Sequence, residues 1–160
     1  MAASCRATAG QSPRILPRAA NFILTIDFCL ILRSAYELLF CDTMTGRQIT
    51  SATELRDVKW ASWTCTLGWP AQGIWAAGMD GSDINAVARS HSGHLLASAD
   101  DLGRVNLFRY PADQPGAASV GYAAHSSHVM NVRWTVGDEF LLSCGVSAWS
   151  DMLLHSSLFR

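Results

Sequence analysis

Lysine is almost absent from this 160-residue sequence. Lys59 is the only lysine, so arginine supplies nearly all of the positive charge. The 12 basic and 13 acidic residues nearly cancel and leave a net charge of −1. A chain without a field of one sign has no electrostatic preference for nucleic acid or for an anionic membrane surface. We therefore expect neither of them as a partner.

Closely paired cysteines are also missing. The cysteines are odd in number and widely scattered, and no two form a CxxC pair: Cys5, Cys29, Cys41, Cys65 and Cys144. This pattern is typical of reduced, mostly buried thiols and argues against a disulfide framework or a zinc knuckle. We expect no metal and no cofactor.

The apolar run NFILTIDFCLIL, at 21–32, is interrupted by Asp27. A helix that crosses a bilayer needs about 20 apolar residues. The run is too short for that and carries a charge in its middle, so it predicts a buried strand.

Acidic residues are absent from the first 20 positions, which are rich in alanine and serine and carry Arg6, Arg14 and Arg18. Such a composition is typical of an organelle targeting segment. Pro13 and Pro17 disfavour the amphipathic helix that this segment would need. A disordered leader is the preferred interpretation, with targeting as the alternative.

From residue 36 on, short strand-like stretches alternate with turn residues. YELLFCD (36–42) ends before the Thr45-Gly46 turn. DINAVARS (83–90), HLLASA (94–99) and RVNLFRY (104–110) are joined by HSG and DDLG. Three strands with such short connections predict an antiparallel meander.

The chain also repeats itself with an offset of 45 residues and no gap. The matching pairs are Ser82 and Ser127, Ile84 and Val129, Val87 and Val132, Leu96 and Leu141, and Ser98 and Ser143. A period of about 40 to 45 residues with four strands per unit is the signature of a WD-repeat β-propeller blade. The predicted fold is therefore all-β.

In WD blades a buried hydrogen-bond relay can join four side chains. These are a His before the first strand, a Ser or Thr on the second, an Asp in the next turn and a Trp on the third strand. The matching positions are Asp80 (at the His place), Ser98, Asp101 and Phe108 (at the Trp place) in the first unit, and His125 and Ser143 in the second. Each unit holds only part of the relay.

Several polar side chains invite a catalytic or metal-binding interpretation. Asp100 and Asp101 could divide acid and base roles, but neighbouring carboxylates on a tight turn usually point apart and serve the turn. His91 and His94 lie in a predicted hairpin turn, and a zinc site would need further ligands at compatible spacing. His125, which lies three residues before His128, occupies the position at which a WD blade anchors its inner strand. We expect no enzyme.

One segment breaks the period. The separation of Cys41 and Phe108, which occupy matching third-strand positions, exceeds the repeat, and the surplus falls in the stretch RDVKWASWTCTLGWPAQGIWAAGMDG. Its four tryptophans are Trp60, Trp63, Trp69 and Trp75. Such a density of aromatic residues is typical of a locally expanded core. The alternative is a partner-binding patch, because exposed tryptophan is a favoured interface anchor.

This segment, together with DGSDINAVARSHSGHLLASADDLGRVNLFRYP and AHSSHVMNVRW, resembles the second propeller of the echinoderm microtubule-associated protein-like family. The similarity covers residues 36–145. It implies tandem β-propellers without catalysis, tubulin or microtubules as partners, and a location in the cytoplasm on the cytoskeleton.

The ends depart from this pattern. We expect residues 1–34 to be a non-matching leader, residues 35–145 to hold about two blades and part of a third, and residues 146–160, with Trp149, to be a non-matching tail. A truncated or alternatively spliced form is the preferred interpretation. Its alternative function is competition for the partners of the full-length protein, without tubulin binding. Incomplete propellers leave strand edges unpaired, so we also expect marginal stability or dependence on a partner.

Overall fold

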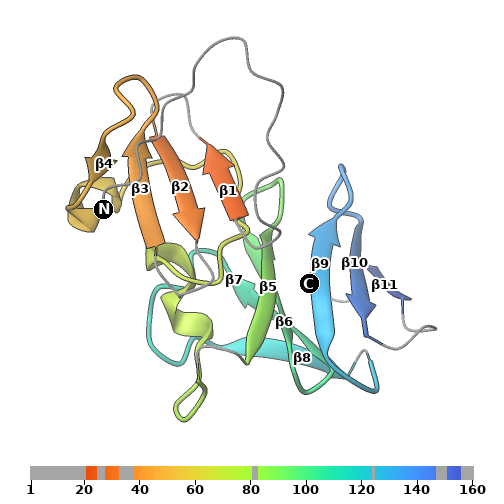
Figure 1. Cartoon of the computed structure of the whole chain (residues 1–160). Coiled ribbons are helices and arrows are strands. Elements are labelled where there is room, and N and C mark those ends of the chain that lie inside the picture. The colour runs from red at the N-terminus through yellow and green to blue at the C-terminus, as the bar shows by residue number, and fades with distance from the viewer. Residues whose placement is uncertain are drawn as a thin grey trace. The chain divides into compact units, whose positions relative to one another are not determined.

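A computed structural model describes residues 21–24, 28–32, 38–80, 83–123, 125–146 and 151–155; for 21–24, 28–32 and 151–155 only the backbone is described. The expected leader at 1–20, Cys5, Ser82 and Trp149 lie outside the described residues. The chain divides into two compact units, Met1–Ala61 and Ser62–Arg160. Strands in antiparallel sheets make up most of the regular structure (Figure 1).

The first unit holds a four-stranded sheet in the order β1-β2-β3-β4. Its strands are β1 (Asn21–Leu24), β2 (Phe28–Leu32), β3 (Leu38–Asp42) and β4 (Gln48–Ile49). The apolar run that we expected to be one strand forms two, which pair with each other from Leu24↔Cys29 outward. Two strands of this sheet are therefore formed by residues that we assigned to the leader.

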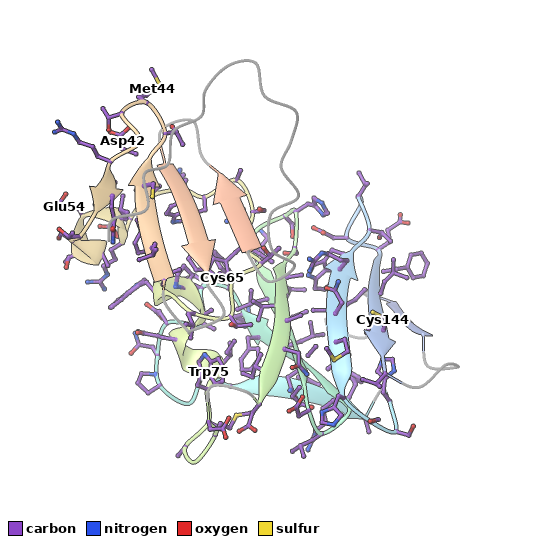
Figure 2. All side chains as sticks on the ribbon, viewed as in Figure 1. Asp42, Met44, Glu54, Cys65, Trp75 and Cys144 are labelled. Carbon is purple, nitrogen blue, oxygen red and sulfur yellow. The ribbon has the colours of Figure 1, made fainter. Side chains whose placement is uncertain are left out.

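The turn after β3 is stabilised by Asp42. Its Oδ1 accepts hydrogen bonds from the backbone N–H groups of Met44 (2.8 Å) and Thr45 (2.9 Å), and Gly46 supplies a positive φ of 66°. Figure 2 shows Asp42 and Met44 in this loop. The hydrogen bond from the Thr45 backbone lowers the pKa of Asp42. The 3₁₀ helix η1 (Ala52–Leu55) follows.

The second unit begins at Ser62, within the tryptophan-bearing segment, and contains the 3₁₀ helix η2 (Trp69–Ile74). Its four-stranded sheet, the second sheet, has the order β5-β6-β7-β8. The strands are β5 (Ile84–Arg89), β6 (Leu95–Asp100), β7 (Arg104–Arg109) and β8 (Ser119–Ala123). The first three match the predicted meander to within one residue at each end.

The third sheet has three strands in the order β9-β10-β11: β9 (Val129–Trp134), β10 (Phe140–Gly145) and β11 (Asp151–His155). β11 lies in the stretch that we assigned to a tail, and it pairs antiparallel with β10. A third strand therefore occupies its expected place despite a sequence that departs from the repeat.

The backbone register reproduces the 45-residue repeat. Val87 lies opposite Ser98 in the second sheet, and Val132 lies opposite Ser143 in the third. Each pair places a fully buried valine beside a buried serine. The predicted all-β fold of propeller blades is confirmed, with two four-stranded sheets and one of three strands. In the described part of the chain no helix is long and apolar enough to span a membrane.

Candidate functional site

The second and third sheets meet along β5 and β9, which lie side by side (Figure 1). We call this contact the seam. In the second sheet, β5 and β6 contribute small side chains to it, Ala86, Ala88, Ala97 and Ala99, and β7 adds Val105 and Leu107. The third sheet contributes larger ones: Val129, Val132, Trp134 and Leu141. Small residues on one side let the backbones approach and give the larger side chains room to pack.

Trp134 is the largest side chain of the seam. It is 7% exposed, and its indole Nε1 donates a 2.9 Å hydrogen bond to the carbonyl oxygen of Ala88 on the facing strand. Burial of the ring in the seam favours association of the two sheets, and the hydrogen bond fixes the position of the ring. Apolar burial and a polar contact thus act at the same place.

Asp101 ties the sheets together at one end of the seam. Its Oδ1 lies 2.8 Å from His128 Nδ1 and accepts a 2.6 Å hydrogen bond from Asn85 Nδ2. The same Asn85 amide donates to the carbonyl oxygen of Val129 at 3.1 Å. The contacts from His128 and then Asn85 lower the pKa of Asp101, although burial and the charge of Asp80 oppose the shift.

At the other end of the seam, Asp138 links the two sheets by hydrogen bonds. Its Oδ1 accepts a hydrogen bond from the backbone N–H of His91 at 2.8 Å and lies 2.9 Å from His91 Nδ1. Its Oδ2 accepts the N–H of Ser92 at 2.7 Å. Burial acts to raise the pKa of Asp138, but the hydrogen bonds from Ser92 and His91 outweigh it, so the pKa is lowered.

Close backbone contact adds a further tie beside Asp101. His125 N–H donates to the carbonyl oxygen of Gly103 at 3.0 Å. Gly103 has a φ of 79°, and a Cβ at this position would collide with the carbonyl oxygen of His125. Only glycine combines this conformation with this approach.

The relay positions predicted from the repeat are only partly brought together. His125 Nε2 lies 2.8 Å from Ser143 Oγ in the third sheet. In the second sheet, the Ser98 hydroxyl is buried and has no hydrogen-bond partner within the described ranges, so Asp80 does not take the part of the histidine there. Phe108 is 6% exposed and lies opposite Leu96 in the sheet. A role of the relay positions as links within a blade, Asp101 included, stays a proposal.

Sequence reasoning assigned the Asp100–Asp101 pair to turn formation, but it did not separate the roles of the two residues. Asp100 is 4% exposed, and its Oδ1 accepts the backbone N–H groups of Leu102 at 3.0 Å and Arg104 at 2.8 Å. Its Oδ2 accepts a hydrogen bond from Asn106 Nδ2 at 3.0 Å. Asp100 therefore holds the β6–β7 turn, while Asp101 points to the next sheet. Strand alternation was the available signal, because Ser98 and Asp100 lie on the same face of β6.

Most of the tryptophan cluster is structural. Trp60 and Trp63 are 5% and 1% exposed. Trp63 Nε1 donates to the carbonyl oxygen of Cys65 (2.8 Å), and Trp75 Nε1 donates to that of Thr66 (3.0 Å). Figure 2 labels Cys65 and Trp75 in this segment. Trp69 is 39% exposed and Trp75 is partly buried, so the partner-binding role expected of the tryptophans stays a proposal, and it concerns Trp69 first.

Burial also defines the chemistry of Cys65. The side chain is fully buried, and desolvation raises the pKa of its thiol to about 11. The thiol is therefore protonated and unreactive at neutral pH. No group of three or more His, Cys, Asp or Glu side chains that could hold a metal is found among the described residues. His125 and His128 bind different partners, one in its own sheet and one across the seam.

Comparison with known proteins gives a family match over residues 9–152, to the second β-propeller of echinoderm microtubule-associated protein. The chain is 50% identical over 132 residues to echinoderm microtubule-associated protein-like 2 of Rattus norvegicus and of Homo sapiens, which covers 79% of this chain and 20% of each relative. It is 50% identical over 110 residues to the 77 kDa echinoderm microtubule-associated protein of Strongylocentrotus purpuratus, with 69% of this chain and 16% of that protein covered. The chain thus spans about a fifth of these relatives.

Proposed function

Because the chain belongs to the echinoderm microtubule-associated protein family, we propose that it is a non-catalytic propeller scaffold that associates with tubulin or microtubules on the cytoskeleton in the cytoplasm. The observation that carries the proposal is the family match, which extends over residues 9–152. The relatives are microtubule-associated proteins by name.

The geometry supports a scaffold without catalysis. The carboxylates and histidines that could do acid and base chemistry, Asp101, Asp138, His91 and His128, are engaged in hydrogen bonds between two sheets. Asp100 is committed to a turn. Side chains that hold the fold in this way are not positioned to exchange protons with a substrate.

Two binding assays test the proposal. The purified 160-residue chain is mixed with stabilised microtubules and sedimented, and separately used to capture soluble tubulin on beads. We expect the chain in the microtubule pellet, in an amount that saturates, and tubulin on the beads. An inert protein of similar size and charge serves as the control for trapping.

Absence of binding in both assays would remove the proposal for this chain. The second candidate function is competition for the partners of a longer family member. The small share of each relative that the chain covers favours it in that case. It predicts that added chain lowers the binding of a relative to its partners although the chain itself does not bind tubulin.

A further inference from the structure

The outer strand of the second sheet, β8, has an open edge. It pairs with β7 on one side, from Phe108↔Ser119 to Arg104↔Ala123, and it is the last strand in the order of the sheet. In the described part of the chain no strand pairs with its other side. The backbone N–H and C=O groups that point outward along this edge can therefore pair with an added strand.

Stacking of successive sheets does not cover this edge. The third sheet packs against a face of the second, mainly through contacts of β9 with β5 and β6. The strand β8 lies at the margin of the sheet opposite β5. A further sheet that stacked in the same manner would lie on the third sheet and not beside β8. The open edge therefore does not depend on how many sheets follow.

The strand β8 also lacks the features with which proteins prevent pairing at strand edges, namely charged residues, proline and bulges. Its sequence SVGYA has no charged residue and no proline, and its register with β7 runs without a shift. Val120 is 57% exposed, and Ser119, Gly121 and Ala123 are exposed as well. The edge is therefore accessible and regular.

A positive charge borders this edge on one face of the sheet. Arg104 is exposed, and its Nη2 lies 3.0 Å from the position that a Cβ of Gly121 would occupy. The guanidinium thus lies across β8, in the space that the glycine leaves. Asp100 bonds to the backbone N–H of Arg104 and to Asn106, and no ion pair of Arg104 is found among the described residues. This cation can therefore pair with a carboxylate on an added strand.

On the other face, a mainly apolar cavity of about 550 Å³ adjoins the start of β8. Leu95 and Leu107 line it from β6 and β7, Pro111 and Ala117 line it from the β7–β8 loop, and Val120 lines it from β8. Its volume lies within the range of about 300–1,000 Å³ that is typical of ligand pockets. It can receive an apolar side chain that enters beside Val120.

We propose that β8 is a docking edge for a partner protein, which adds an extended segment of alternating apolar and acidic residues as a fifth strand. Residues that pair across two strands lie on the same face. A residue opposite Val120 therefore points to the cavity, and the next one, opposite Gly121, points to Arg104. This alternation has the two-residue period of a strand. Main-chain pairing supplies affinity in this mode of recognition, and the alternate side chains supply specificity.

The proposal goes beyond microtubule association and does not depend on it. Fluorescence anisotropy with the full chain and a labelled peptide, Val-Glu-Val-Glu-Val-Glu-Val, tests it. We expect saturable binding. The peptide Val-Lys-Val-Lys-Val-Lys-Val has the same apolar residues and the opposite charge, and it should bind at least about tenfold more weakly. No saturable binding of the glutamate peptide, or equal binding of the two peptides, would overturn the proposal.

Two pairs of variants locate the binding. Arg104→Glu should weaken binding of the glutamate peptide by roughly tenfold or more, whereas Arg133→Glu, the same change at an exposed arginine of the third sheet, should not. Val120→Glu should weaken it similarly, and Val136→Glu, at a valine that is 90% exposed after β9, is its control. Circular dichroism establishes that each variant is folded.

Amide hydrogen exchange gives an independent readout, because an added strand engages the outward N–H groups of β8. Bound glutamate peptide should slow exchange in β8 and leave exchange in β9 unchanged. Unchanged exchange in β8 would contradict strand addition. Binding that Arg104→Glu and Val120→Glu leave as in the wild type, or that the control variants reduce equally, would place it elsewhere and overturn the proposal.

Discussion

At the scale of single residues, two adjacent aspartates have different structural roles. Asp100 accepts three hydrogen bonds inside the β6–β7 turn, whereas Asp101 bonds to Asn85 and His128 at the seam. From the sequence, the turn chemistry of the pair was predictable. Strand alternation indicates that Asp100 shares the face of Ser98, but the role of Asp101 was not predictable, because it depends on where the next sheet begins.

Replacement of Asp100 by alanine should therefore lower the free energy of unfolding. Two backbone N–H groups and the Asn106 amide lose their acceptor, and each buried unsatisfied group costs about 1–3 kcal/mol. Urea denaturation measures the change. Glu139→Ala, at an exposed carboxylate of the same unit, is the control and should stay within about 0.5 kcal/mol of wild type. Equal effects of the two substitutions would contradict the role of Asp100.

The two seam carboxylates predict an acid-sensitive contact. The pKa values of Asp101 and Asp138 are both lowered. A depressed folded-state pKa contributes stability that is complete above the ordinary value of about 3.9 and is lost as the pH falls through the lowered value. The free energy of unfolding should therefore decline as the pH falls below about 4.

Urea denaturation at a series of pH values checks this dependence. The double variant Asp101→Asn, Asp138→Asn should show a shallower decline than the wild type, while Glu139→Gln should keep the wild-type slope. Identical slopes for the wild type and the double variant would show that the seam carboxylates do not carry the effect.

At the scale of elements, the predictable strands were those bounded by strong turn residues. β5, β6 and β7 were predicted because HSG and DDLG separate apolar stretches of strand length. The strand β8 was not, because its sequence SVGYA is short and contains a glycine, which strands disfavour. The division of residues 21–32 into two strands was missed because the run is apolar on both sides of Asp27.

The turn between β6 and β7 also makes a close backbone contact with His125. Gly103→Ala should cost at least about 3 kcal/mol, because a left-handed backbone is strained and the new Cβ meets the carbonyl of His125. Gly93→Ala is the matched control. Its φ of 75° is similar, but nothing lies within 4 Å of the added carbon, so the cost should be about 1 kcal/mol.

The thermal midpoints of the two variants, measured side by side, give the comparison. A larger decrease in the thermal midpoint for Gly103→Ala than for Gly93→Ala shows that residue 103 must be glycine because of the contact with His125 as well as the local backbone strain. Equal losses would mean that the approach of His125 to Gly103 contributes nothing to stability.

At the scale of the whole molecule, the repeat and the family resemblance were sufficient to predict propeller blades. The polar ties at the two ends of the seam were not predictable, because Asp138 and His91 are 47 positions apart in sequence and meet only when two hairpins stack. Closed propellers have roughly four to eight blades, and the described residues form three sheets. We expect the stability of the second and third sheets to depend on the seam between them.

The low charge of the chain makes a prediction about its association with microtubules. With one lysine and a net charge of −1, a contact with tubulin would depend on shape and apolar burial more than on charge. Salt screens only the charge component of such a contact. Binding should therefore vary little with ionic strength and should require an intact seam.

Microtubule co-sedimentation at low and at high salt, with the wild type and with Gly103→Ala in parallel, tests the central claim most directly. The proposal that a folded blade scaffold associates with microtubules predicts saturable pelleting of the wild type that changes little with salt. It also predicts weaker pelleting of Gly103→Ala. Failure of the wild type to pellet, or pelleting that salt abolishes and Gly103→Ala leaves unchanged, would contradict it.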